Sequence, residues 1–105
     1  MPTTHAFRMQ LRTGVIDEYR RRHDEIWPEL TVLLHDSGIR DYSIFLDEET
    51  LSLFAVLTLT DDHRRDTLPD HPLMRRWWDW MAPLMEVEPG NKPLEWPLVP
   101  MFHMD

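Results

Sequence analysis

Apolar and polar side chains alternate along residues 6–12, before any longer period appears. The apolar positions are Phe7, Met9 and Leu11, and each is followed by an arginine or a glutamine. A period of two residues predicts a β-strand with one buried face. Thr13 then interrupts the alternation, and its hydroxyl is predicted to cap the helix that follows.

Between residues 15 and 36 the period changes to that of a helix. Apolar side chains recur at three- and four-residue intervals and form one stripe, which comprises Ile16, Tyr19, His23, Ile26, Trp27, Leu30, Leu33 and Leu34. Pro28 has no N–H with which to continue the helix ladder, so a kink or a restart is expected near Trp27. The Ser37-Gly38 pair is predicted to close the helix in a left-handed cap.

Two further strands are predicted at 42–46 and 51–60, joined by an acidic turn. In the second of them both faces are apolar, because Phe54 and Val56 oppose the leucine-rich set at 51, 53, 57 and 59. An antiparallel strand with one solvated face would be polar there. Something is therefore expected to cover that second face.

A second helix is predicted from about Pro72 to Met85, with Asp70 as its cap. Its broad apolar arc comprises Leu73, Met74, Trp77, Trp78, Trp80, Met81, Leu84 and Met85. Residues 61–70 and 86–97 are expected to be loops, and 98–103 an edge or exchanged strand, since Pro100 excludes a central one.

The predicted order is βαββαβ, which indicates an α+β fold of the ferredoxin-like type in a single domain over 1–105. Both helices would cover one face of the sheet. The other apolar face would then pack against a second sheet, most simply from an identical chain. We therefore expect a homodimer with its two sheets face to face.

Composition removes several classes of function. The net charge is −8, which argues against nucleic acid as the main partner. There is no cysteine for disulfides or thiol chemistry, and no apolar run is long enough to span a membrane. The histidines lack metal-site spacing, and no glycine-rich nucleotide motif is present. We expect a cytoplasmic protein with no metal, no cofactor and no membrane partner.

Two groups of residues are candidates for chemistry. His23 lies on the apolar stripe one turn after Tyr19, so it is either a core histidine with its hydrogen bonds satisfied or a proton-transfer group. Trp77 and Trp78 project about 100° apart on a helix, so at most one can point squarely into the core. The pair is either a core staple or the wall of a pocket.

Several strings in the chain resemble the L-rhamnose mutarotase family. They are the stretch 6–10, the stretch 18–30 with its Tyr-x-x-x-His-x-x-x-Trp-Pro-Glu-Leu pattern, the stretch 42–47, the Arg-Trp-Trp block at 76–81 and the ending 102–105. The resemblance runs over nearly the whole chain in collinear order. The Tyr-x-x-x-His-x-x-x-Trp-Pro-Glu-Leu pattern and the Arg-Trp-Trp block together make the resemblance specific.

The resemblance implies a dimeric α/β barrel that interconverts the α and β anomers of L-rhamnose by acid/base ring opening, without a cofactor. By matching position, His23 would be the proton donor, and Tyr19, Tyr42, Trp77 and Trp78 would contact the sugar. The general base stays unassigned. Two other functions remain open, namely a non-catalytic sugar-binding protein and a haem-binding or cofactor-free oxygenase of the same barrel type.

Overall fold

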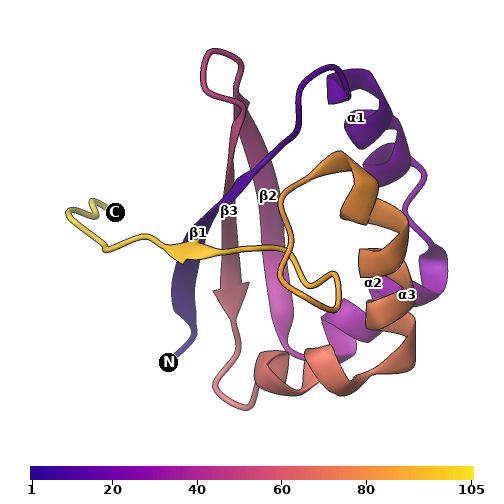
Figure 1. Ribbon diagram of the computed structural model, residues 1–105. Helices are drawn as coiled ribbons and strands as arrows, with labels where there is room; N and C mark the ends of the chain where they lie inside the picture. The colour runs from indigo at the N-terminus through magenta and orange to yellow at the C-terminus, as the bar shows by residue number, and fades with distance from the viewer.

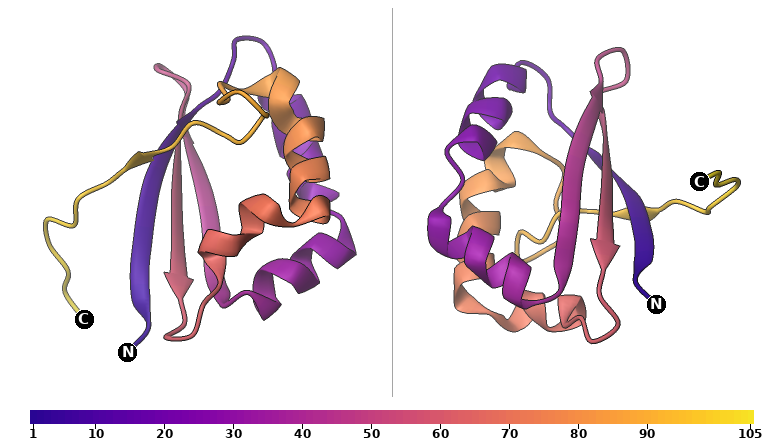
Figure 2. Two further views of the ribbon diagram at one scale, coloured as in Figure 1. Left: turned by 60° about the horizontal axis from the view of Figure 1, so that its bottom comes forward. Right: turned by 180° about the vertical axis from the view of Figure 1, so that it is seen from behind.

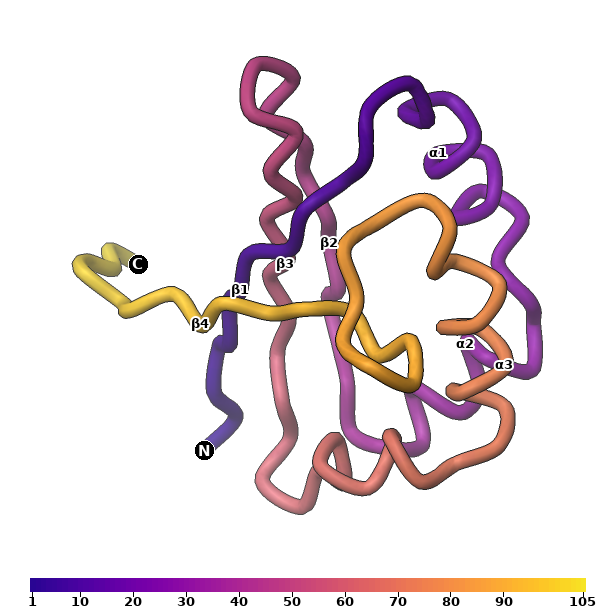
Figure 3. Tube along the Cα trace, in the orientation of Figure 1, coloured from indigo at the N-terminus to yellow at the C-terminus, as the bar shows by residue number.

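A computed structural model describes residues 1–105 (Figures 1–3). Its elements in chain order are β1 (Thr3–Gln10), α1 (Ile16–Asp24), α2 (Pro28–Asp36), β2 (Ile39–Asp47), β3 (Ser52–Leu59), the 3₁₀-helix η1 (Arg65–Asp70), α3 (Pro72–Met81), the 3₁₀-helix η2 (Ala82–Leu84) and β4 (Trp96–Pro97). No helix is both long enough and apolar enough to cross a bilayer.

The four strands form one antiparallel sheet in the order β2-β3-β1-β4. The three α-helices all lie on the same side of it (Figures 1 and 2). The predicted α+β, ferredoxin-like arrangement is confirmed. Its inner face carries the alternating apolar set predicted for β1 and β3, including Phe7, Met9, Leu53 and Leu57, all of which are at most 4% exposed.

The outer face of the sheet is open in the single chain and partly apolar. Phe45 pairs with Phe54 across the β2–β3 ladder, and Arg8 of β1 pairs with Phe54 on the other side. Phe45 is 65% exposed and Val56 is 37% exposed. The predicted apolar second face therefore exists.

An irregularity in β2 sets the direction of Tyr42. The register with β3 shifts between Arg40 and Ser43, and Asp41 has a φ of +49°. Such a bulge inserts one extra residue and re-aims the side chains beside it. Tyr42 consequently points to the inner side of the sheet, where it lines the cavity described below.

The helix boundaries confirm one prediction and correct two. The long first helix is two helices, because the chain breaks before Pro28 as expected. Thr13 does not cap α1: a turn through Gly14 (φ +82°) intervenes, and Val15 occupies the capping position without a side-chain bond. Asp70 does not cap α3 either, because it ends η1, and the ring of His71 accepts the N–H of Leu73 instead.

Two predictions about apolar segments are also wrong. Trp80 is 44% exposed and does not join the buried arc of α3. The last strand is not at 98–103 but at Trp96–Pro97, where it pairs with Phe7 and Arg8. Residues 98–105 carry no strand and run outward on the side of the sheet away from the helices (Figures 1 and 2).

Candidate functional site

A cavity of about 840 Å³ lies between the inner face of the sheet and the helices. Its lining is mostly apolar, with polar and charged side chains interspersed among the hydrophobic ones, which is typical of a small-molecule site. All five residues singled out by sequence line this one cavity; they are His23, Tyr19, Tyr42, Trp77 and Trp78.

His23 is fixed by its own helix. Its ring Nδ1 lies 3.1 Å from the carbonyl oxygen of Tyr19, one turn earlier in α1. A carbonyl can only accept, so Nδ1 carries the hydrogen and Nε2 of the neutral ring is a free acceptor. Burial lowers the pKa of His23, against smaller raising effects from the Tyr19 carbonyl and Asp24. The residue is therefore a neutral imidazole near pH 7.

Two tyrosines line the same cavity as this imidazole. The Tyr19 ring packs 4.4 Å from the His23 ring, centroid to centroid. Burial, and to a smaller extent Tyr42, raises the pKa of Tyr19. Tyr42 is 40% exposed as a residue, but its hydroxyl is buried, and that burial together with Glu95 raises its pKa to about 12. Both hydroxyls stay protonated and can donate or accept hydrogen bonds.

The two adjacent tryptophans have different environments. Trp77 is 6% exposed and packs edge-on against the His23 ring at 5.4 Å and the Trp27 ring at 5.1 Å. Trp78 is half-buried and lines the cavity. Trp77 thus belongs to the core that holds the imidazole, while Trp78 leaves part of its surface free.

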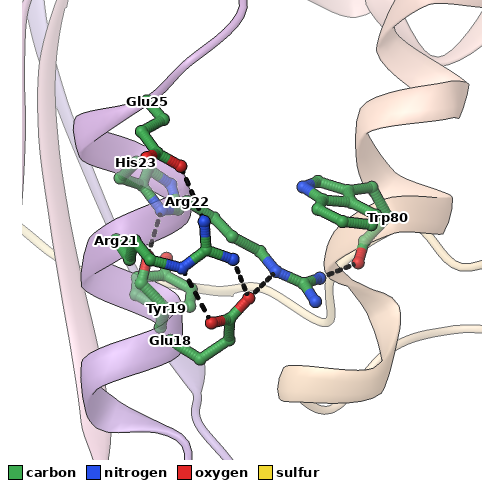
Figure 4. Close-up of polar contacts among 7 residues, drawn as sticks. All are labelled: Glu18, Tyr19, Arg21, Arg22, His23, Glu25 and Trp80. Atoms are coloured by element: carbon green, nitrogen blue, oxygen red, sulfur yellow. Dashed lines mark hydrogen bonds and ion pairs between the residues drawn. The ribbon is translucent and has the colours of Figure 1, made fainter.

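Arg22, next to His23, ties α1 to α3 (Figure 4). Its guanidinium donates to the main-chain carbonyl of Trp80, lies 3.8 Å from the Trp80 ring centroid, and donates to a Glu18 carboxylate oxygen at 2.6 Å. Hydrogen bonds from Arg21 and Arg22 lower the pKa of Glu18 to about 2. The α1 helix that carries the imidazole is thereby held against the helix that carries the tryptophan pair.

Sequence reasoning missed a group of three charged residues on the cavity wall. Arg65 of η1 and Lys92 both donate to the Glu95 carboxylate, at 2.7 and 3.3 Å. Neither of the two stretches that carry them, 61–70 and 86–97, matches a motif. The signal that could have found Glu95 is its place beside Trp96, since neighbouring residues of a strand face opposite sides.

No three His, Asp or Glu side chains gather in a cluster able to hold a metal ion. The polar groups of the cavity include an imidazole, two hydroxyls and one carboxylate held between two cations. Other charged side chains also line it, namely Arg20, Asp24, Arg40, Asp41 and Asp66. This donor set suits a neutral ligand rich in hydroxyl groups, each of which can donate and accept.

Comparison with known proteins finds similar proteins over nearly the whole chain. The family model described as L-rhamnose mutarotase matches residues 4–104. A protein named L-rhamnose mutarotase from Jannaschia sp. (strain CCS1) is 61% identical over 95% of this chain and 96% of its own length, and one from Rhizobium leguminosarum bv. trifolii is 58% identical over 95% and 94%.

A solved structure is also similar over nearly the whole chain. The crystal structure of an L-rhamnose mutarotase from Formosa agariphila superposes with a TM-score of 0.91 at 43% sequence identity, and covers 98% of this chain and 99% of that chain. The chain belongs to the L-rhamnose mutarotase family.

Proposed function

We propose that this protein is an L-rhamnose mutarotase, an isomerase that interconverts the α and β anomers of the sugar. The observation that carries the proposal is a neutral imidazole with one nitrogen anchored and the other free, on the wall of a cavity, in a chain of this family. The same geometry supports His23 as the proton-transfer group.

The proposed reaction moves one proton between two oxygens on the same carbon. Nε2 of His23 accepts the proton of the anomeric hydroxyl, the bond between C1 and the ring oxygen breaks, and C1 becomes an aldehyde carbon. The imidazolium then donates that proton to the former ring oxygen. Rotation about C1–C2 presents the other face of the aldehyde, and the reverse steps close the other anomer.

This order refines the role that the sequence resemblance implied. A proton donor must first hold a proton, and the lowered pKa of His23 leaves its resting ring neutral. His23 therefore acts as base before it acts as acid, and no second titratable group is required. Tyr19 and Tyr42 would bind sugar oxygens, and Trp77 and Trp78 would form the apolar wall against the sugar's C–H face.

The test is anomer exchange in His23 variants. Saturation transfer between the two anomeric protons of L-rhamnose measures the rate above the uncatalysed background. Positioned proton transfer contributes about 10²–10⁴-fold, so His23→Ala should lose that much. His23→Asn is the matched variant, because its amide can still donate to the Tyr19 carbonyl and yet cannot titrate. Wild-type exchange rates in either variant would refute the assignment.

A non-catalytic sugar-binding protein would present a similar cavity, and the same assay separates it from an enzyme. Binding of L-rhamnose without faster anomer exchange in the wild type would identify a sensor. Neither this alternative nor an oxygenase of the same fold is favoured by the comparisons, since the relatives described above are named as mutarotases. A cytoplasmic location stays a prediction.

We also propose a homodimer formed through the outer face of the sheet. The supporting observations are the exposed apolar side chains of that face, above all Phe45, and the exposed apolar residues of the tail 98–105, of which Met101 and Phe102 are 89% and 85% exposed. An identical sheet packed on this face would cover both sets by one symmetric contact.

Phe45→Glu should therefore shift the protein from dimer to monomer. A charge buried in an apolar interface has to be desolvated without a partner, which strongly disfavours association. Sedimentation equilibrium measures the change, and Val32→Glu is a matched control, because Val32 is 58% exposed on α2, away from the sheet face. A Phe45→Glu protein that stays dimeric would show that the interface lies elsewhere.

A further inference from the structure

The charged group formed by Arg65, Lys92 and Glu95 is a built feature of the cavity rather than a chance surface pair. Arg65 donates to one oxygen of the Glu95 carboxylate at 2.7 Å, and Lys92 donates to the other at 3.3 Å. The side chains of Arg65 and Glu95 are only 24% and 20% exposed. The Arg65 guanidinium also lies 5.0 Å from the ring centroid of buried Phe7.

Strand geometry explains why Glu95 faces inward. Trp96 is paired with Arg8, and the Arg8 guanidinium lies 4.1 Å from the Trp96 ring centroid. Arg8 alternates with the inner residues Phe7 and Met9, so this stacked pair is on the outer face of the sheet. The residue before Trp96 must then project to the opposite side. Glu95 accordingly lines the cavity.

The charged group lines the same cavity as the residues proposed to bind the sugar. The pKa of Tyr42 responds to Glu95 and Arg65, and the pKa of Tyr19 responds to Tyr42, after the larger effect of burial in each case. These charges and hydroxyls therefore lie within electrostatic reach of one another.

We propose that Glu95, held between Arg65 and Lys92, is a substrate-binding residue that accepts hydrogen bonds from ring hydroxyls of the sugar. This inference rests on the proposed function and adds a site residue to it. A carboxylate offers about four lone-pair positions. The two cations occupy one on each oxygen, so about two remain for hydroxyl donors.

The cations have a second part in this proposal. They fix the orientation of the carboxylate before the sugar arrives, so less conformational freedom is lost on binding. Lys92 has three N–H donors and gives one to Glu95. Those that remain can donate to the oxygens of the same hydroxyls, so each hydroxyl meets both an acceptor and a donor.

The experiment compares Glu95→Gln with Glu88→Gln. Glu88 is the matched control: its carboxylate lies 3.7 Å from the same Lys92 ammonium, but Glu88 does not line the cavity. Losing hydrogen bonds to a charged group predicts a loss of about 10- to 100-fold in affinity for the sugar. We expect Glu95→Gln to raise KM for L-rhamnose by that factor with kcat within about threefold, and Glu88→Gln to leave both unchanged.

An unchanged KM in Glu95→Gln, or a fall in kcat alone, would overturn the proposal. Equilibrium dialysis of L-rhamnose against the same proteins keeps this test separate from the reaction. If the wild type binds the sugar without exchanging anomers, the proposed function fails while the ratio of Kd values still tests Glu95. If Glu95→Gln does not fold, Lys92→Gln takes its place, with an expected rise in KM of about 3- to 10-fold; no rise overturns the proposal.

Discussion

Replacement of Arg22 by Gln tests whether the link between α1 and α3 positions the site. The Arg22 side chain is only 15% exposed and spans the two helices (Figure 4). Arg21 is the matched control in the same helix. It also binds Glu18, at 2.6 Å, but its side chain is 53% exposed and its other partner, Glu25, lies in the turn that ends α1.

The structure predicts unequal costs for the two substitutions. A hydrogen bond from a charged donor is worth about 1.5–3 kcal/mol, and an exposed cation–π contact about 0.5–1 kcal/mol. Arg22→Gln loses both contacts to Trp80. The shorter glutamine amide recovers part of this stabilisation, so the expected loss in the free energy of unfolding is about 2 kcal/mol. The exposed pairs of Arg21 are worth about 0.3–0.5 kcal/mol each, so Arg21→Gln should cost less than about 1 kcal/mol.

Urea titration at one fixed protein concentration measures the free energy of unfolding of both variants. In 0.5 M NaCl the effect of Arg21→Gln should shrink, because exposed charges are screened, while most of the effect of Arg22→Gln should remain. Equal destabilisation of the two variants would contradict the assignment of Arg22 as the link. So would a wild-type KM and kcat in Arg22→Gln.

Three further predictions concern the cavity. Because the reaction needs neutral His23, kcat/KM for anomer exchange should fall as pH falls, with a midpoint below the ordinary histidine pKa of 6.5; a midpoint above 6.5 would contradict the neutral resting state. The same lowered pKa makes His23 stabilise the fold fully above about pH 6.5, a contribution lost as pH falls through the folded pKa. Trp77→Ala should cost about 3–5 kcal/mol of stability, as other large-to-small core substitutions do. Trp78→Ala should instead weaken sugar binding more than it lowers Tm. Equal melting temperatures of the two variants would refute the assignment of Trp77 to the core and Trp78 to the cavity wall.

The sequence predicted the features that depend on local periodicity. The inner face of β1 and the buried leucines of β3 follow from a spacing of two residues. The break at Pro28 follows from a missing N–H. His23 and Tyr19 share one helical turn, so their proximity was also predictable. All of these are properties of one element considered alone.

The features that the sequence did not predict depend on how elements meet. The helix caps were misplaced because the turn at Gly14 and the short helix η1 displace the chain by one or two residues. Trp80 has the spacing of a core residue, yet Arg22 from another helix holds it at the surface. Glu95 faces the cavity only because a two-residue strand forms after a loop without a motif.

The tautomer of the His23 imidazole and its position over the cavity are fixed by different contacts. The bond from the ring of His23 to the Tyr19 carbonyl lies within α1, so the tautomer is set by that helix alone. The position of the ring over the cavity is set by contacts between helices, through Trp77 and through Arg22. An Arg22→Gln protein should therefore keep the acid limb of the pH profile while its kcat/KM falls. A shifted limb would mean that the tautomer and the placement are coupled, and that α1 does not fix the proton by itself.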